Sequence, residues 1–432
     1  MKALALLLAL SAPASAAPDW AALGRETKEH LVNLIRIDTS NPPGNEIAAA
    51  YYLKGVLDPA GIANEILVAT GTRASLVARV KGAGSKRPLL LICHTDVVPA
   101  EAKDWSVPPF AAVEKDGYLY GRGAGDIKSM CAAELVVLLE LKRQNAALAR
   151  DVIFLAQADE ESGAADSHAL WLTKNHAAKI SAELGINEGG FTLWKDGRIA
   201  SFELQVAEKR YVDLKLVARG PTGHSSLPND KNAVHALVRA AARLSEWKAP
   251  RELTPAAAAT LAGGAMTAGS PEAEALQRDT CAVTILKAGY KSNVVPAEAQ
   301  AEVNCRLLPG RALAPFLAEI KRVIAEPAVE VRYEGPAFGT LADMPFDHPF
   351  VADIQAAARE AAPGAPVRPY MSIWSTDAGA YRSLGIKVYG LDPPLTLEDV
   401  EGVHGNDERI PLAAIEPYTK LLYLLTQRSA GR

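Results

Sequence analysis

Apolar residues follow the period of a helix at the start of this chain and the pattern of buried strands further on. A spacing of three to four predicts helices over residues 21–37 and 47–57. Later runs, at 89–92 and 152–155, are apolar at every position. Such strands are typical of sheets that carry helices on both faces, so we expect an α/β/α sandwich. The elements expected in this part are strands at 88–93, 152–156 and 184–186 and helices at 130–142 and 165–176.

Near residue 205 the expected elements change to the order strand, helix, strand, strand, helix, strand. This βαββαβ order predicts a ferredoxin-like antiparallel sheet with two helices, an α+β unit of its own. Its elements are expected at 211–217, 232–247, 281–287, 300–307, 313–324 and 329–333. Residues 254–276 are rich in Ala, Gly and Pro, which favours helix-prone or loose surface chain. Strands and helices alternate again after residue 338, so we predict a domain at 17–204 and 337–432 with a second domain, 205–336, inserted into it.

The first sixteen residues have the three parts of a signal peptide. Met1-Lys2 is a short basic start, residues 3–10 are apolar, and Ala14-x-Ala16 provides a cleavage site. The alternative is an apolar N-terminal helix packed on the domain. No later stretch reaches the roughly 18 apolar residues that a transmembrane helix needs. We therefore expect residues 1–16 to be removed and the protein to be periplasmic or secreted, with no membrane span.

The composition is that of an ordinary globular protein and excludes two classes. The chain has 432 residues, 49% of them apolar, and can bury a large core, which excludes a mini-protein scaffold. Lys and Arg number 46 against 50 Asp and Glu, a formal net charge of −4. Binding to phosphate backbones needs an excess of basic residues, so nucleic acid is not an expected partner.

Four cysteines in a chain of this length are not a disulfide framework. Cys281 and Cys305 lie in two strands of the inserted domain, so a bridge between them and two free buried thiols both fit the sequence. Cys93 directly precedes His94, and in a strand its side chain points to the opposite face. We interpret Cys93 as a core residue.

Acids and histidines follow several of the expected strands. His94 and Asp96 end the strand at 88–93 and share a face, where the carboxylate can accept the imidazole N–H and leave the other nitrogen free for a metal. Asp126 follows a Gly-rich turn and precedes a helix, whose dipole favours an acid. A phosphate-binding turn is the alternative, but the spacing matches no such fingerprint and the acid would repel phosphate.

Three further sites carry candidate metal ligands. Asp159-Glu160-Glu161 follows the strand at 152–156, and Glu188 closes the strand at 184–186. Consecutive acids are costly to gather at a buried strand end unless cations neutralise them, although a solvated charge run is the common alternative. His404 follows a loop with two prolines, where a lone histidine is more often an ordinary surface residue.

Side chains at the carboxyl ends of strands in an open sheet converge on one crevice, and these residues suit two zinc ions there. We expect His94 and Glu188 to hold one ion. Glu161 and His404 would hold the other, and Asp126 would bridge the two. Two Zn²⁺ against three carboxylates leave a charge of +1, which a bridging hydroxide cancels.

Six segments of the chain resemble the motifs of a known family. They are His94-Thr95-Asp96-Val97-Val98-Pro99, Trp105-x-x-Pro108-Pro109-Phe110, Gly121-Arg122-Gly123-x-x-Asp126-x-Lys128, Asp159-Glu160-Glu161-Ser162-Gly163, Asn187-Glu188-Gly189-Gly190 and His404-Gly405-x-Asp407-Glu408. Together they are similar to the co-catalytic zinc family of glutamate carboxypeptidase, aminoacylase, succinyl-diaminopimelate desuccinylase and carboxypeptidase S, and most similar to the carboxypeptidase S-like branch. The resemblance implies a zinc-exopeptidase-like α/β/α domain with an inserted lid and dimerisation domain.

The resemblance also implies roles for residues of the lid. His224, in Gly220-Pro221-Thr222-Gly223-His224, looks like the histidine that reaches the partner subunit's active site and polarises the scissile carbonyl. Asn293 and Arg306 match lid positions that bind the substrate's carboxylate, for which an amide donor and a guanidinium are suited. From the residues alone, His224 is a loop histidine and Arg306 a surface charge. Asp377 is followed by Ala378-Gly379, where carboxypeptidase S-like members often carry Arg.

We therefore expect a homodimeric di-zinc amidohydrolase that cleaves the terminal amide of a small peptide or an N-acyl amino acid with a free carboxylate. Cobalt or manganese would be substitute metals. Glu160 lies beside a ligand without being one, as a general base for a metal-bound water must, and would pass the proton to the leaving amine. The alternatives are an aminopeptidase-type di-zinc hydrolase, which lacks the βαββαβ insert and prefers a free amine, and a non-catalytic binding protein on the same fold.

Overall fold

The computed structural model describes residues 17–162, 167–264, 266–267, 269–333, 335 and 343–431. The signal peptide expected at 1–16 lies outside these described residues. The same holds for Gly163 of the acidic motif and for the expected domain boundary at residues 336 and 337.

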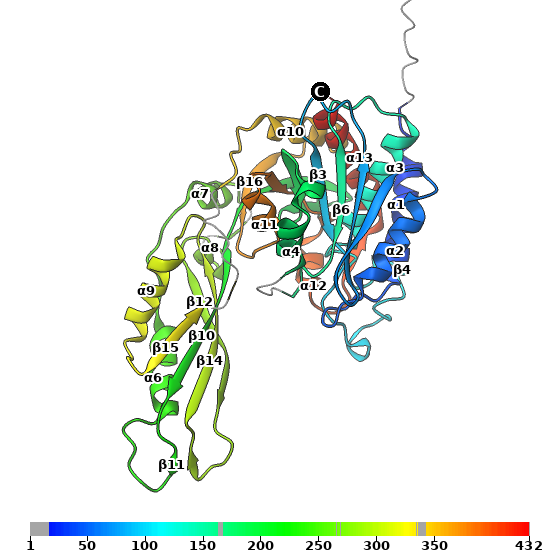
Figure 1. The fold of residues 1–432 in the computed structure, drawn as a ribbon. Helices are drawn as coiled ribbons and strands as arrows, with labels where there is room; N and C mark the ends of the chain where they lie inside the picture. Colours follow the sequence, from blue (N-terminus) through cyan, green and yellow to red (C-terminus); the bar gives the residue numbers. More distant parts are fainter. Residues whose placement is uncertain are drawn as a thin grey trace, which may run out of the picture.

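A ten-stranded mixed sheet forms the centre of the larger of two bodies (Figure 1). Its strand order is β1-β2-β6-β3-β7-β17-β9-β8-β18, and β16 pairs with β9. The strands are β1 (Ala63–Thr70), β2 (Arg73–Val80), β3 (Leu89–His94), β6 (Val152–Gln157), β7 (Leu184–Asn187), β8 (Phe191–Lys195), β9 (Arg198–Glu208), β16 (Val367–Ser372), β17 (Lys387–Gly390) and β18 (Pro394–Leu395). The four central strands, β6, β3, β7 and β17, are parallel to one another, whereas β2 and β9 on either side of them are antiparallel.

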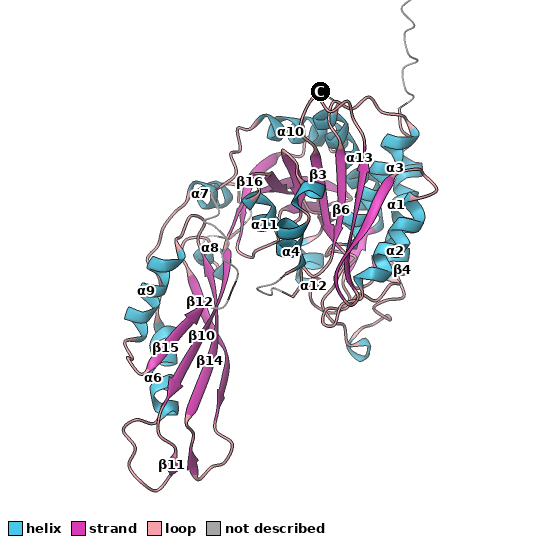
Figure 2. Cartoon of the chain, viewed as in Figure 1, coloured by secondary structure: helices cyan, strands magenta, loops and turns pink. Residues whose placement is uncertain are grey.

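Helices cover both faces of this sheet, which confirms the expected α/β/α sandwich (Figure 2). Leu89 and Leu91 of β3 belong to the large core cluster on one face, whereas Leu90 and Ile92 belong to the cluster on the other. The first face carries α1 (Trp20–Ile35), α2 (Glu46–Leu57), α3 (Lys128–Arg143), α10 (Pro349–Ala361) and α13 (Leu412–Ala430). The second carries α4 (His168–Asn175), α5 (Ala177–Ile180) and α11 (Ala378–Ser383). In the described part of the chain, we find no helix with the length and apolar character required to cross a membrane.

Three short strands and a short helix complete the rim of the larger body. The strands form a small antiparallel sheet, which brings the segment after His404 against the segment before the Gly-rich turn. These elements are β4 (Val113–Lys115), β5 (Tyr118–Tyr120), β19 (Arg409–Pro411) and α12 (Leu397–Gly402), with a 3₁₀ turn at Ala102–Asp104.

A four-stranded antiparallel sheet forms the arm that extends from the larger body (Figure 1). Its strand order is β12-β14-β10-β15, and α6 and α9 contribute the apolar side chains that pack on one face. The elements are β10 (Arg210–Arg219), α6 (Ala233–Glu246), β12 (Thr280–Ala288), β14 (Glu298–Leu307), α9 (Leu313–Ile324) and β15 (Val329–Tyr333). Because β9 ends at Glu208 and β10 begins at Arg210, the chain passes from one sheet to the other at Lys209. At the far end, β11 (Gly223–His224) pairs with β13 (Val294–Val295).

The Ala-rich stretch at 254–276 is helical in two places. It forms α7 (Pro255–Ala262) and α8 (Pro271–Ala275), whose N-termini are capped by the side chains of Thr254 and Ser270. α7 packs against β16, and Ala257 of α7 is fully buried. The expectation of a helix-prone stretch is thus confirmed, and its described residues include both buried positions, such as Ala257, and exposed positions, such as Pro255.

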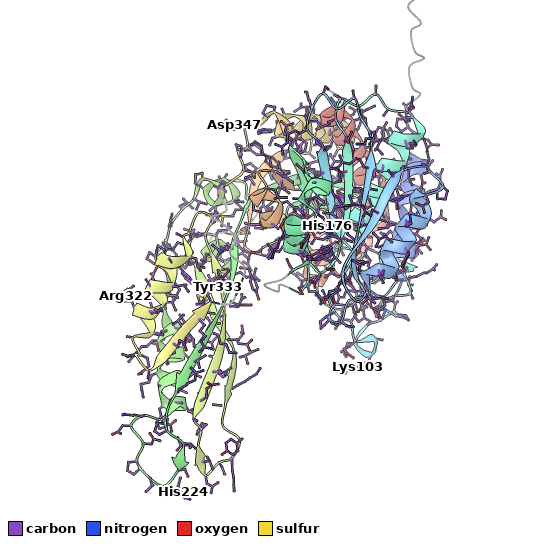
Figure 3. All side chains as sticks on the ribbon, in the orientation of Figure 1. Lys103, His176, His224, Arg322, Tyr333 and Asp347 are labelled. Carbon is purple, nitrogen blue, oxygen red and sulfur yellow. A yellow bond between two sulfur atoms is a disulfide. The ribbon has the colours of Figure 1, made fainter. Side chains whose placement is uncertain are left out.

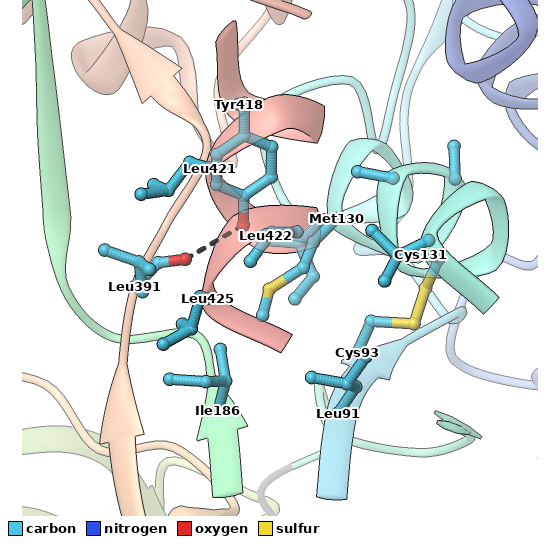
Figure 4. Packing of buried hydrophobic residues seen from close by; sticks show 14 of the residues in the cluster. Leu91, Cys93, Met130, Cys131, Ile186, Leu391, Tyr418, Leu421, Leu422 and Leu425 are labelled. Atoms are coloured by element: carbon cyan, nitrogen blue, oxygen red, sulfur yellow. Dashed lines mark hydrogen bonds between the residues drawn. A yellow bond between two sulfur atoms is a disulfide. The ribbon is translucent and has the colours of Figure 1, made fainter. Parts of the chain in front are cut away.

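Both pairs of cysteines form disulfides. Cys281 and Cys305 lie directly opposite each other on β12 and β14 and are bonded, which decides between the two alternatives. Cys93 is buried, as expected, but it is bonded to Cys131 on α3 (Figure 4). The interpretation of Cys93 as a core residue is therefore confirmed, and its bond to α3 is an addition that the sequence did not predict. A strand and a helix 38 residues apart give no sign of such a contact in the sequence.

Candidate metal centre

Three neighbouring parallel strands deliver most of the candidate ligands to one edge of the large sheet. His94 is the last residue of β3, Glu188 directly follows β7, and Glu161 lies four residues beyond the end of β6. Since the order of these strands is β6-β3-β7, their carboxyl ends meet at the same edge. Asp126 joins them from the Gly-rich turn before α3, and His404 joins them from the loop between α12 and β19.

The five candidate ligands form one continuous cluster. His94 Nε2 lies 3.0 Å from Asp126 Oδ1 and 3.7 Å from Glu188 Oε1. His404 Nε2 lies 3.0 Å from Asp126 Oδ2 and 3.2 Å from Glu161 Oε2. The two carboxylate oxygens of Asp126 therefore face different histidines, so that Asp126 lies between two halves of the cluster. Two groups of three side chains have ligand atoms that all lie within 4.8 Å of one another, namely His94, Asp126, Glu161 and, with the neighbouring Glu160, His94, Glu160, Glu188.

The acids and histidines of the cluster shift one another's pKa values. Burial and the nearby charge of Glu188 raise the pKa of Glu160 well above its usual range. Burial likewise raises the pKa of Glu188. Hydrogen bonds to Asp126 and Glu161 raise the pKa of His404 to about 10. Imidazole nitrogens and carboxylate oxygens are ligands that divalent metal ions such as zinc prefer, and the residues present therefore fit a metal centre.

Asp96 supports this cluster in a different way from the one expected. The imidazole Nδ1 of His94 lies 3.0 Å from the backbone oxygen of Asp96 and 3.6 Å from its carboxylate Oδ1. The carboxylate accepts instead the backbone N–H groups of Glu160 and Glu161, at 3.1 and 3.0 Å. The backbone carbonyl of Asp96 thus fixes the ring of His94, and its carboxylate fixes the acidic loop.

A polar network behind Asp96 was not predicted from the sequence. Asn41 donates from Nδ2 to Asp96 Oδ2 and to Asp159 Oδ1, at 2.9 Å each. Arg73 forms an ion pair with Asp159 and donates to Asn41 Oδ1 at 3.0 Å. Asp159 has a positive φ of 65°, and this network holds it there. No sequence signal pointed to Asn41 or Arg73, because neither residue follows a strand or lies near its partners in the chain.

Glu408 joins the turn that carries Asp126 to the loop that carries His404. Its Oε1 accepts the backbone N–H groups of Gly123, Gly125 and Asp126, at 3.1, 2.7 and 3.0 Å. Arg122 donates to Glu408 Oε2 at 2.7 Å and to the carbonyl oxygen of Gly405 at 2.8 Å. The Gly121-Arg122-Gly123 and His404-Gly405-x-Asp407-Glu408 segments were noted in the sequence, but their contact was not foreseen.

A pocket of about 510 Å³ opens over the cluster. Asp126, Glu160, Glu161, Glu188 and His404 all line it. Arg306 and Tyr211 of the arm also line it, so Arg306 is a pocket residue rather than a surface charge. An apolar part of the wall is formed by Ile127, Phe191, Pro393, Leu395, Val400 and Val403.

His224 and Asn293 lie far from this pocket within one chain. His224 is exposed at the tip of the arm, at the end away from the large sheet (Figure 3). Its Nδ1 lies 2.8 Å from the hydroxyl of Ser226, and the carbonyl oxygen of Asn293 accepts the backbone N–H of Ser225. His224 and Asn293 thus lie near each other at the tip of the arm. Arg306, the third of the expected lid residues, lies in the pocket with the candidate metal ligands.

The model of peptidase family M20/M25/M40 matches residues 90–428, which include the whole cluster. This chain belongs to that family. The N-fatty-acyl-amino acid synthase/hydrolase PM20D1 of Xenopus tropicalis is 31% identical over 375 residues, which cover 79% of this chain and 72% of the relative. The resemblance seen in the sequence is confirmed, and the chain is a hydrolase of this family.

Solved structures share the fold. The M20 family metallo-carboxypeptidase Sso-CP2 from Sulfolobus solfataricus superposes with a TM-score of 0.72 at 22% identity, over 93% of this chain and 99% of that chain. The YXEP protein from Bacillus subtilis, a dinuclear metal-binding peptidase of the M20 family, superposes with a TM-score of 0.65 at 16% identity, over 95% and 99% of the two chains.

Proposed function

We propose that this chain is a zinc-dependent amidohydrolase that cleaves the terminal amide bond of N-acyl amino acids or small peptides with a free carboxylate. The observation that carries the proposal is that four of the five candidate ligands line one pocket together with Glu160 and Arg306, and that the fifth, His94, lies directly behind Asp126 and Glu188. PM20D1 and a probable carboxypeptidase S-like protein of Dictyostelium discoideum are relatives whose names agree with this chemistry.

The ligands fall into two pairs around Asp126. We assign His94 and Glu188 to one ion and Glu161 and His404 to the other, with Asp126 shared. Zinc suits this donor set, with cobalt or manganese as substitutes. When bound, the ions would polarise the substrate carbonyl and lower the pKa of water.

Glu160 is the proposed general base. Its backbone N–H is held by Asp96, and its carboxylate faces the pocket beside His94 and Glu188. From there it accepts a proton from the attacking water and delivers it to the amine nitrogen that leaves. Arg306 binds the free carboxylate of the substrate at the other end of the pocket, where a guanidinium can make two parallel hydrogen bonds.

The apolar wall of the pocket favours an apolar acyl group. Val400 and Val403 lie at its α12 side, and the partly exposed Trp374 also lines the pocket. An acyl chain on this surface would be removed from water, which stabilises binding by about 0.8 kcal/mol per buried methylene. Val400→Asp should therefore raise the KM of a long-chain N-acyl amino acid about tenfold while the N-acetyl analogue changes little.

Removal of the base tests the mechanism. Glu160→Gln should lower kcat by about 10²- to 10⁴-fold, because the proton then has no acceptor, and should leave the metal content unchanged. Exposed Glu101 offers the matched control, Glu101→Gln, which should keep full activity. Metal analysis and kinetics on N-acyl amino acids and dipeptides, with free and amidated carboxyl ends, provide the readouts. Full activity of Glu160→Gln, or a metal-free active protein, would contradict the mechanism.

The same substrate panel separates the alternative functions. An aminopeptidase-type hydrolase would be supported if hydrolysis is lost when the substrate's amine is blocked and stays the same when the substrate's carboxylate is amidated. Tight binding of an N-acyl amino acid without hydrolysis of any substrate would support a non-catalytic binding protein. Hydrolysis of N-acyl amino acids that requires a free carboxylate is the outcome expected here.

We also propose that the protein is exported. Two disulfides persist in oxidising compartments, and residues 1–16 have the pattern of a signal peptide. Cell fractionation and N-terminal sequencing should find a periplasmic or secreted protein that begins near Ala17.

A further inference from the structure

We infer that Tyr211, Asp213 and Asn304 form a positioning unit that fixes the guanidinium plane of Arg306, and that the preference for a free carboxylate depends on Tyr211. This inference rests on the proposed function, in which Arg306 binds the substrate's carboxylate. Nothing in the sequence alone pointed to Tyr211, Asp213 or Asn304.

The register of the arm's sheet places these four side chains on one face. β10 and β14 are antiparallel, with Tyr211 opposite Arg306 and Asp213 opposite Asn304. Residues opposite each other or two apart share a face of a sheet. The alternate residues of these strands, such as Val212 and Cys305, are buried in the core under α6 and α9. The four polar side chains therefore lie on the face that the helices leave open, next to the pocket.

The four side chains form a closed ring of contacts. The guanidinium carbon of Arg306 lies 4.5 Å from the centroid of the Tyr211 ring. The Tyr211 hydroxyl donates to Asp213 Oδ2 at 2.6 Å, and Asn304 Nδ2 donates to Asp213 Oδ1 at 2.7 Å. Arg306 Nε closes the ring by donating to Asn304 Oδ1 at 3.2 Å. Each member is thus held from two sides.

This arrangement leaves the reactive edge of Arg306 free for a ligand. Its Nε is bound to Asn304, while within the described residues Nη1 and Nη2 have no hydrogen-bond partner. The carboxylate of Asp213 does not neutralise Arg306 directly, because its two oxygens bind Tyr211 and Asn304. A flexible arginine loses rotamer freedom when it binds, whereas one that is already stacked and hydrogen-bonded loses less. The closed ring of contacts therefore holds Nη1 and Nη2 of Arg306 as a rigid, planar pair of donors. Such a pair matches the two oxygens of a carboxylate, whereas a carboxamide has one oxygen.

Three variants test this inference. Tyr211→Leu removes the ring under the guanidinium and should raise the KM of an N-acyl amino acid about tenfold, with kcat changed by less than about twofold. Tyr211→Phe keeps the stacking and loses the hydrogen bond to Asp213, so its effect should be about threefold. The amidated form of the same substrate should respond to neither change. Lys215 lies further along β10, and Lys215→Met is the matched control that should leave both substrates unaffected.

Coupling to Arg306 distinguishes positioning from a structural role. In an Arg306→Ala background, Tyr211→Leu should have no further effect on KM, because the group that it orients is gone. Equal losses for both substrates, or the same loss with and without Arg306, would overturn the inference.

Calorimetry separates this inference from the proposed function. If the wild-type protein hydrolyses N-acyl amino acids and Tyr211→Leu has the wild-type KM, the inference fails and the function stands. If the wild-type protein hydrolyses none of them, titration of the Glu160→Gln protein with the N-acyl amino acid decides. Binding that Tyr211→Leu weakens about tenfold would still support the inference, and unchanged or absent binding would overturn it.

Discussion

Glu408 is a buried residue whose single carboxylate joins the turn that carries Asp126 to the loop that carries His404. In Glu408→Gln, the cation of Arg122 remains buried without its partner, and the three N–H groups around Asp126 lose a charged acceptor. Breaking a buried ion pair destabilises a fold by about 3 to 5 kcal/mol. We expect this loss in urea unfolding, together with about 10- to 100-fold weaker zinc binding in a chelator competition. Exposed Glu401 provides the control, and an effect of Glu401→Gln of similar size would contradict this explanation.

His168 should make the fold sensitive to mild acid. Its side chain is 2% exposed, and among the described residues neither ring nitrogen has a hydrogen-bond partner. Burial lowers the pKa of His168 to about 4, against 6.5 for the free side chain. The folded state therefore prefers the neutral ring, so this contribution to stability is complete above pH 6.5 and is lost as the pH falls towards 4.

The variant His168→Phe isolates this contribution. Phenylalanine keeps the edge contact with Trp171 and cannot be protonated. Between pH 7 and pH 4.5, the free energy of unfolding should fall by about 1 to 3 kcal/mol more for the wild-type protein than for the variant. Parallel curves for the two proteins in urea unfolding would show that His168 does not titrate as a buried group.

The disulfide between Cys93 and Cys131 joins β3 to α3 at the level of the metal ligands. Cys93 precedes His94, and α3 follows the turn that carries Asp126. The double variant Cys93→Ala/Cys131→Ala should lose about 2 to 4 kcal/mol of stability and also bind metal more weakly. Cys281→Ala/Cys305→Ala removes a disulfide inside the arm and should lose stability without weaker metal binding. Equal metal affinity of the two double variants would show that the first disulfide does not support the centre.

Elements were predictable from the sequence where burial leaves a strong local pattern. β3 and β6 are apolar on both faces, and acids or histidines directly after such strands had to meet at one edge, which identified His94, Glu161 and Glu188. Asp126 and His404 were less evident, because they lie on turns rather than at the ends of strands, and they joined the predicted cluster only through the ligand count of a two-metal site. The network of Asn41 and Arg73 and the ring around Tyr211 depend on contacts between distant segments, which single positions do not encode.

At the scale of the whole molecule, the arm places two groups of candidate functional residues far apart. Arg306 lies at its base and faces the pocket of its own chain, whereas His224 lies at its tip. The tip also exposes Leu227 and, in the loop between β12 and β13, Tyr290, with 66% and 83% of their surface accessible. Exposed apolar side chains of this size are typical of interaction surfaces. We therefore propose that the arm places His224 and Asn293 in the pocket of a second copy of the chain.

Mixing two inactive variants tests this arrangement. Glu160→Gln lacks the base, and His224→Ala lacks the group that would polarise the carbonyl, so each homodimer should be about 10²-fold or more below wild type. In a mixed dimer, the chain with Glu160 intact receives His224 from its partner, and one of the two pockets is complete. Activity should therefore reappear after the variants are unfolded and refolded together, in proportion to the mixed species separated by an affinity tag. Within one chain His224 lies far from Glu160, so it can act on the substrate only in the pocket of a partner. Wild-type activity of His224→Ala alone, or a mixture no more active than its components, would therefore exclude a shared active site.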